Sequence, residues 1–212
     1  MALIPTRRFA LLALAALLLA GGPALAAAPA PAGGPVPAEM AMGNPKARVT
    51  MIEYASASCP HCARFNNDVF PLVKRKYIDT GKVRYVLREF LTEPVPLAAA
   101  GFLLARCSGE ARYFSTLDQF FHAQAEIYST GKALPVFVRI GQSVGMNEEQ
   151  VRACITDQAA ADTLTAKVEG YAASAGIDAV PTFLINGTKL EGEQPFTAID
   201  AAVQAALKKK GG

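Results

Sequence analysis

Hydrophobic positions in the first half of the chain follow a strand pattern, then a helical one, then a strand pattern again. Val49–Ala55 is a nearly unbroken apolar run, which is typical of a central strand covered on both faces. A helix is expected from Pro60, and a second strand over residues 83–90. Pro71 predicts a kink in that helix, because its ring removes a backbone hydrogen bond. The apolar residues with helical spacing are Phe65, Val69, Leu72, Val73 and Tyr77.

The second half of the chain is helical before strand signals return. Residues 97–175 have the apolar spacing of helices. Thr182–Ile185 and residues 188–190 then read as two strands around Asn186 and Gly187, a dipeptide typical of tight hairpins. Neither half of such a sheet could cover itself alone. We therefore expect an α/β fold with one sheet interrupted by a helical insertion, divided into residues 43–93, 94–175 and 176–212.

Two capping boxes predict where helices begin. Asn147 is followed three positions later by Gln150, and Thr197 is followed three positions later by Asp200. In such a box the first side chain accepts from a backbone N–H of the first turn, and the second reaches back. Helices are therefore expected to start after Asn147 and after Thr197.

The first residues resemble an export signal. Arg7 and Arg8 precede an apolar run over residues 9–20, and Ala26 ends a small-x-small cleavage pattern. We expect a signal peptide over residues 1–26, with an uncleaved membrane anchor as the alternative. Residues 27–42 follow as a flexible linker, because the stretch is rich in Ala, Pro and Gly.

Composition supports an exported globular protein and gives no sign of a nucleic-acid binder. Apolar residues make up 51% of the chain, enough for a packed core. The formal charge of +3 is small, and nucleic-acid binding usually needs a clustered basic face. The four cysteines are an even number, which suits a compartment where disulfides persist.

The candidate chemistry lies in Cys59-Pro60-His61-Cys62, at the expected junction of strand and helix. If Cys59 is the N-cap, Pro60 occupies the first helical position, where its missing N–H costs nothing. The free N–H groups and the positive end of the helix then stabilise a Cys59 thiolate, and His61 adds a donor and a cation when protonated. We expect a lowered Cys59 pKa, an exposed Cys59 and a buried Cys62. A structural disulfide and a zinc site are the weaker alternatives.

Glu53 lies six residues before Cys59, within the apolar strand. We expect a buried acid below the dithiol, with a raised pKa, that takes the proton from Cys62 when this thiol resolves a mixed disulfide. The alternative is an acid that faces solvent on a partly exposed strand.

Three other residues are singled out by position. Cys107 and Cys154 lie in the helical stretch, and in an exported protein two such thiols favour a structural disulfide over two inert cysteines. Pro181 opens the late strand, a sheet position that proline tolerates, but the pattern leaves its cis or trans state open.

These motifs resemble the DsbA family of periplasmic thiol:disulfide oxidoreductases. The resemblance implies a first cysteine of low pKa and an oxidising disulfide. The resemblance implies a thioredoxin-like fold with an inserted α-helical subdomain. The matching positions are Gly43, Asn44, Pro45, Ala47, Val49, Glu53, Cys59, Pro60, His61, Cys62, Pro71, Val180, Pro181 and Thr182.

The resemblance also implies roles for particular residues. Pro181 is expected to be cis and to pack beside the dithiol, with the Val180 backbone pairing with an extended substrate segment. Val180 before that proline is typical of the oxidase branch. A basic partner for the buried acid would be Arg84 or Arg88.

Together these features predict a monomeric dithiol oxidase of the periplasm, with no cofactor beyond the Cys59–Cys62 disulfide and no metal. Its partners would be newly exported cysteine-containing proteins and, by family inference, a quinone-linked membrane oxidase of the DsbB type. One alternative is a reductase or isomerase on the same fold. A copper-delivery protein using the dithiol with His122 is another, and a module that only holds unfolded chains is a third.

Overall fold

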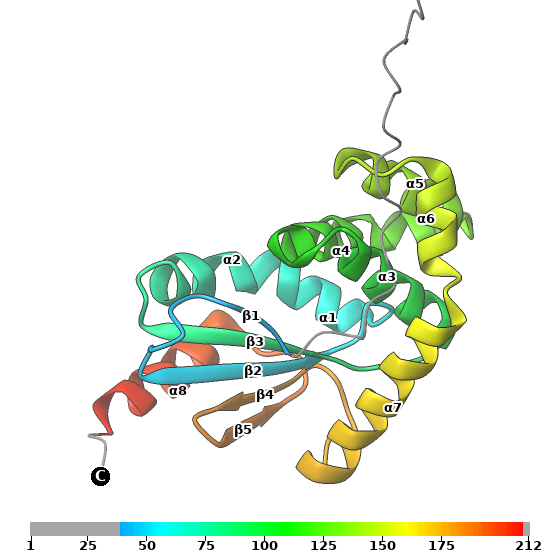
Figure 1. Ribbon diagram of the computed structural model, residues 1–212. Coiled ribbons are helices and arrows are strands. Elements are labelled where there is room, and N and C mark those ends of the chain that lie inside the picture. Colours follow the sequence, from blue (N-terminus) through cyan, green and yellow to red (C-terminus); the bar gives the residue numbers. More distant parts are fainter. Residues whose placement is uncertain (1–38, 210–212) are drawn as a thin grey trace, which may run out of the picture.

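The computed structural model describes residues 39–209, and the expected signal peptide lies outside them. A five-stranded sheet of order β1-β3-β2-β4-β5 forms the centre of the fold (Figure 1). β2 and β3 are parallel, whereas β1, β4 and β5 each run antiparallel to their neighbour. The strands are β1 (Met40–Met42), β2 (Val49–Ala55), β3 (Val83–Glu89), β4 (Thr182–Ile185) and β5 (Thr188–Glu191).

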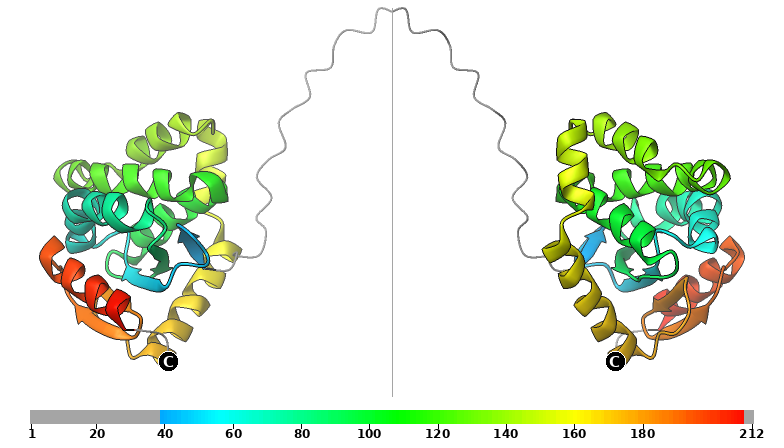
Figure 2. Two further views of the ribbon diagram at one scale, coloured as in Figure 1. Left: turned by 90° about the vertical axis from the view of Figure 1, so that its left-hand side faces the viewer. Right: turned by 90° about the vertical axis from the view of Figure 1, so that its right-hand side faces the viewer.

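Helices connect and cover this sheet (Figures 1 and 2). α8 contacts α2, β2 and β4, whereas α3 to α6 lie above the sheet in Figure 1. α7 contacts α3 and β3 and runs down past the right-hand end of the sheet in that view. The α-helices are α1 (Pro60–Arg64), α2 (Phe70–Val73), α3 (Val95–Cys107), α4 (Tyr113–Thr130), α5 (Ala133–Ser143), α6 (Glu148–Ile155), α7 (Gln158–Ala175) and α8 (Phe196–Lys208). The segments η1 (Phe65–Val69), η2 (Lys74–Ile78) and η3 (Glu110–Arg112) complete them.

The predicted fold class is confirmed: a mixed sheet is interrupted by helices between β3 and β4. A single hydrophobic core extends from the sheet into these helices, from Met51 and Phe183 to Phe120 and Val151. The insertion is thus continuous with the core of the sheet. Among residues 39–209, no helix has the length and apolarity needed to cross a membrane.

The predicted linker over residues 27–42 is wrong at its end. Met40–Met42 forms β1 and pairs with β3, with Met40 opposite Leu87 and only 5% exposed. Without this strand, β3 would present an unpaired edge. The linker was predicted from composition, which does not reveal a strand of only three residues.

The helix that starts at Pro60 continues to Ile78, but not as a regular α-helix. η1 and η2 are π-helical turns, and the Phe70 N–H bonds to the Phe65 carbonyl, five residues back. Pro71 follows directly, has no N–H and would clash with the carbonyl four residues earlier. The widened turn accommodates that ring, so the structure has π-helical turns around Pro71, where the sequence predicted a kink.

One predicted capping box is present and the other is absent. Asn147 and Gln150 cap α6 reciprocally. α8 instead begins at Phe196 with no side-chain cap, so the box predicted at Thr197 is wrong. Asp200 does not reach back to the start of α8, because it accepts a hydrogen bond from the Tyr77 hydroxyl and pairs with a lysine of η2.

The late hairpin follows the sequence pattern closely. Asn186 and Gly187 connect β4 to β5 with φ values of 44° and 85°, the left-handed pair that a tight turn between twisted strands requires. The Asn186 side chain also accepts from the Thr50 N–H at 2.8 Å. The turn is therefore fixed to the beginning of β2.

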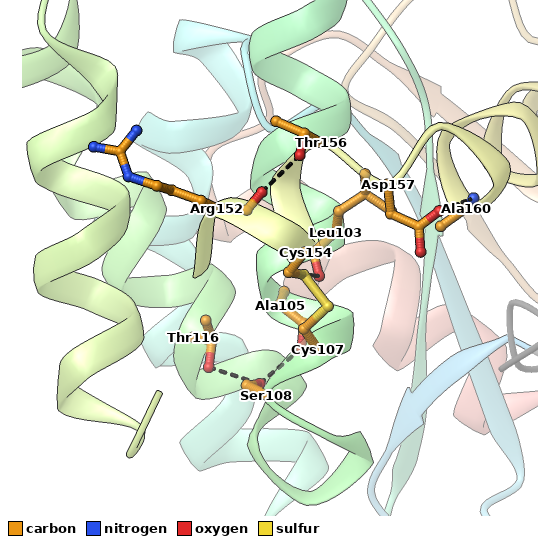
Figure 3. The surroundings of a disulfide bond; sticks show 10 residues. All are labelled: Leu103, Ala105, Cys107, Ser108, Thr116, Arg152, Cys154, Thr156, Asp157 and Ala160. Carbon is orange, nitrogen blue, oxygen red and sulfur yellow. Dashed lines mark hydrogen bonds between the residues drawn. A yellow bond between two sulfur atoms is a disulfide. The ribbon is translucent and has the colours of Figure 1, made fainter. Parts of the chain in front are cut away.

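Cys107, at the end of α3, and Cys154, in α6, form a disulfide with a Cα–Cα distance of 6.4 Å (Figure 3). The bond joins two helices of the insertion that already pack on each other.

Candidate functional site

The end of β2 delivers the dithiol to the start of a helix. After Ala55 the chain turns through Ser56, whose carbonyl accepts the Cys59 N–H at 3.1 Å. Cys59 has the extended backbone of an N-cap, with φ −80° and ψ 119°, and Pro60 takes the first helical position. This is the local structure that the sequence motif predicts.

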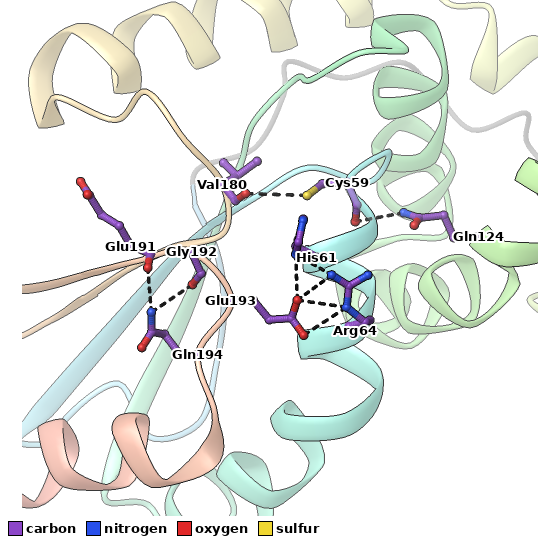
Figure 4. Close-up of polar contacts among 9 residues, drawn as sticks. All are labelled: Cys59, His61, Arg64, Gln124, Val180, Glu191, Gly192, Glu193 and Gln194. Atoms are coloured by element: carbon purple, nitrogen blue, oxygen red, sulfur yellow. Dashed lines mark hydrogen bonds and ion pairs between the residues drawn. The ribbon is translucent and has the colours of Figure 1, made fainter.

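Both cysteines of the motif are free thiols, and both are buried. Cys62 is fully buried and Cys59 is 8% exposed, so the expectation of an exposed Cys59 is wrong. The cause is the segment before Pro181: the Val180 carbonyl lies 3.7 Å from the Cys59 sulfur and covers it (Figure 4). Cys59 nevertheless remains the more accessible sulfur of the pair.

The two thiols have opposite electrostatic environments. The pKa of Cys59 is lowered from 9.0 to about 6, first by a hydrogen bond from the Cys62 thiol. The backbone N–H groups of Cys62 and His61 and the charge of His61 lower it further, against the effect of burial. The pKa of Cys62 is raised, mainly because burial disfavours its thiolate. Of the two sulfurs, Cys59 is therefore the one that exists as an anion at neutral pH.

Glu53 is buried beneath this pair, with 3% of its surface exposed. Burial raises the pKa of the Glu53 carboxyl to about 8, although a hydrogen bond from the Tyr85 hydroxyl at 2.7 Å opposes this. The charge of Cys59 raises it further, and the charge of Glu53 in turn raises the pKa of Cys62. The three groups are electrostatically coupled.

Neither arginine expected as a basic partner of Glu53 contacts that acid. Arg88 bonds to the Tyr54 hydroxyl and pairs with Glu39. Strand alternation sends Arg84 and Arg88 to the face of β3 opposite Tyr85. The polar partner of Glu53 is instead a neutral phenol, which explains why its pKa stays high.

The His61 ring is turned toward two charged residues that sequence reasoning missed (Figure 4). Its Nδ1 lies 2.8 Å from a carboxylate oxygen of Glu193, and the Arg64 guanidinium bonds to the same carboxylate at 2.8 Å. Arg64 could have been found as the next position on the face of α1 that carries His61. Glu193 comes from the loop after β5, and nothing in the sequence connects it with the dithiol.

Val180 and Pro181 border a groove beside the dithiol. The peptide bond between them is cis, as the resemblance implies. The groove measures about 600 Å³. It is lined by His61, Val69, Val180, Pro181, Gly192, Glu193, Gln194 and Pro195.

Within residues 39–209, no three His, Cys, Asp or Glu side chains gather into a metal-binding group. His122, the histidine considered for a copper site, lies on α4 and bonds to the carbonyl of Asp118 at 2.9 Å. The groove beside the dithiol does not include it.

Comparison with known proteins fits this geometry. A family model described as thioredoxin matches residues 36–205. The chain belongs to the thioredoxin family. The crystal structure of Wolbachia pipientis alpha-DsbA1 superposes with a TM-score of 0.75 at 28% identity, covering 82% of this chain and 94% of that one. The resemblance to DsbA proteins and the thioredoxin-like fold with a helical insertion are thereby confirmed.

Several proteins with similar sequences are named as disulfide oxidoreductases. A "Putative protein-disulfide oxidoreductase" of Rickettsia typhi is 33% identical over 176 residues, and one of Rickettsia conorii is 34% identical over 173. Each match covers 81% of this chain. The chain spans only 64% and 61%, respectively, of the length of these relatives.

Proposed function

We propose that this protein is a thiol–disulfide oxidoreductase of the DsbA type that works as a dithiol oxidase through Cys59 and Cys62. The observation that carries the proposal is the contrast between the two sulfurs, one with a lowered pKa and one with a raised pKa. A stabilised Cys59 thiolate favours the reduced protein, so the disulfide form is a strong oxidant. The names and structures of the relatives support the same chemistry.

The reaction proceeds in two exchanges. A substrate thiolate attacks the Cys59 sulfur of the Cys59–Cys62 disulfide, and Cys62 leaves as a thiolate. Glu53, protonated near neutral pH, gives its proton to Cys62, because a buried thiolate is unfavourable there. A second substrate thiolate then attacks the substrate sulfur of the mixed disulfide, and Cys59 leaves as a stabilised anion. The substrate departs with one disulfide, and the enzyme retains two electrons.

The Val180 backbone and the groove beside it position the substrate. A carbonyl next to the Cys59 sulfur can pair with an extended segment, as in strand addition. Because Val180 also covers the sulfur, a substrate must displace or replace this contact. Newly exported proteins with reduced cysteines are the substrates we propose, in the periplasm, with the protein acting as a monomer. A quinone-linked membrane oxidase of the DsbB type would reoxidise it.

Redox equilibration with glutathione separates an oxidase from a reductase. An oxidase with a stabilised Cys59 thiolate should reach equilibrium at an oxidising potential, about 100 mV or more above that of thioredoxin. A potential in the thioredoxin range would instead make the protein a reductase. In cells, a Cys62→Ala variant should accumulate mixed disulfides through Cys59, whereas Cys59→Ala should trap none and should abolish oxidation. Activity that survives in Cys59→Ala would favour a module that only holds unfolded chains.

A further inference from the structure

We propose that Gln124 of the helical insertion is a positioning residue that, together with Tyr128, sets the thiolate character of Cys59. The proposal rests on the proposed redox function and assigns part of its control to α4. Gln124 is 3% exposed, and its amide donates to the Ala57 carbonyl at 2.8 Å and to the Cys59 carbonyl at 3.3 Å. Figure 4 shows this side chain reaching from α4 to the dithiol turn.

Tyr128, one helical turn further along α4, completes the contact. Its hydroxyl donates to the Ser58 carbonyl. Three consecutive carbonyls, those of Ala57, Ser58 and Cys59, thus receive donors from a single helix of the insertion. No other element supplies side-chain donors to these carbonyls among the contacts of residues 39–209.

The turn depends on these donors because water cannot replace them easily. Ala57 and Ser58 are fully buried. The Cys59 carbonyl also accepts the Ala63 N–H at 3.1 Å within the helix, so the Ala57 carbonyl is the one that depends on the Gln124 amide. A buried carbonyl without a donor costs free energy. The side chains of Gln124 and Tyr128 supply donors to these carbonyls. They also fix the Cys59 backbone, so that its sulfur meets the N–H groups of the first helical turn.

The effect can be separated from other electrostatic influences, because Gln124 carries no charge. Its replacement leaves every titratable neighbour of the sulfur in place. The titratable groups that face Cys59 are Glu53 on β2, His61, Cys62 and Arg64 on α1, and Tyr128 on α4.

The test is Gln124→Leu, which removes the amide that donates to the Ala57 and Cys59 carbonyls, with little change in side-chain volume. We expect the pKa of Cys59 to rise, so that the thiolate fraction in mild acid falls about three- to tenfold by thiolate absorbance. The equilibrium with glutathione should shift toward the protein disulfide by a similar factor. Thr116→Val is the matched control: Thr116 is a buried polar residue of the same helix, 1% exposed and bonded to Ser108. It should lower stability without moving the Cys59 titration.

An unchanged Cys59 titration in Gln124→Leu, or an equal shift in Thr116→Val, would overturn the proposal. If Gln124→Leu does not fold, Tyr128→Phe decides the matter, because Tyr128 is 45% exposed and its loss is better tolerated. A shift of about twofold in the same direction is expected there, and no shift would refute the role of α4. Failure of the wild-type protein to oxidise a dithiol peptide would refute the proposed function. The role of Gln124 would still stand if the pKa of Cys59 rose in Gln124→Leu.

Discussion

Replacing Glu53 by glutamine tests the buried acid directly, because the change removes the ionisation and keeps an acceptor for the Tyr85 hydroxyl. The folded pKa of about 8 stands against an ordinary value of 4.5. That difference corresponds to about 5 kcal/mol between the neutral and ionised forms of a fully buried carboxyl. Stability measurements at several pH values should therefore detect this one residue.

The direction of the pH dependence follows from which state of the protein, folded or unfolded, binds the Glu53 proton more tightly. Because folding raises the pKa of Glu53, its contribution to stability is fully present below pH 4.5 and is lost as the pH rises through about 8. Between pH 5 and pH 8, the free energy of unfolding should fall by about 3 to 4 kcal/mol on account of Glu53 alone. Glu53→Gln should lack this component and should become the more stable protein, relative to wild type, at the alkaline end.

Denaturant unfolding of the oxidised protein is the appropriate assay, since Cys59 and Cys62 do not titrate when joined. The charge of a Cys59 thiolate is then absent, but burial remains as the principal cause of the raised pKa. Glu149→Gln, an exposed acid in the first turn of α6, is the matched control and should follow wild type. If Glu53→Gln and wild type showed parallel pH profiles, the carboxyl could not be the proton carrier proposed for Cys62.

Three other changes are expected to have measurable effects. His61→Leu should raise the pKa of Cys59 and make the Cys59–Cys62 couple more reducing. An unchanged thiolate titration would show that the His61 side chain does not lower that pKa. Replacing Cys107 and Cys154 together by alanine should lower the melting temperature and cost about 4 kcal/mol, because their bond closes a loop with a sequence separation of 47. The Cys59 titration should persist in that variant. Thr197→Ala should change the free energy of unfolding by less than about 0.5 kcal/mol, since Thr197 is exposed and does not cap α8; a cost typical of a lost cap would contradict the structure.

Local sequence patterns predicted the elements whose causes are local. The hairpin at Asn186 depends on the left-handed backbone of two adjacent residues, and the start of α6 depends on a box four residues long. The placement of Cys59 at a helix N-cap is equally local, since Pro60 selects the first helical position. These features need no knowledge of what packs against them.

The predictions that failed depend on segments distant in sequence. Cys59 is covered by the Val180 carbonyl, 121 positions away, and His61 meets Glu193, 132 positions away. Asp200 matched a capping pattern, but Tyr77 and a lysine of η2 bind it instead. In each case the deciding partner comes from a segment distant in sequence. The periodicity of a single sequence does not reveal such a partner.

The arrangement of the fold explains why two cysteines three positions apart can differ so strongly in acidity. Cys59 lies at the tip of a turn, where the Cys62 thiol and then the N–H groups of the first helical turn stabilise its anion. Cys62 lies one turn inside the same helix, above Glu53, where burial and a neighbouring acid disfavour its thiolate. The sheet therefore supplies the environment that keeps one sulfur protonated, and the start of the helix supplies the one that ionises the other. If α4 holds that turn through Gln124, then the insertion is part of the redox centre, and its sequence should tune the potential without altering Cys59-Pro60-His61-Cys62.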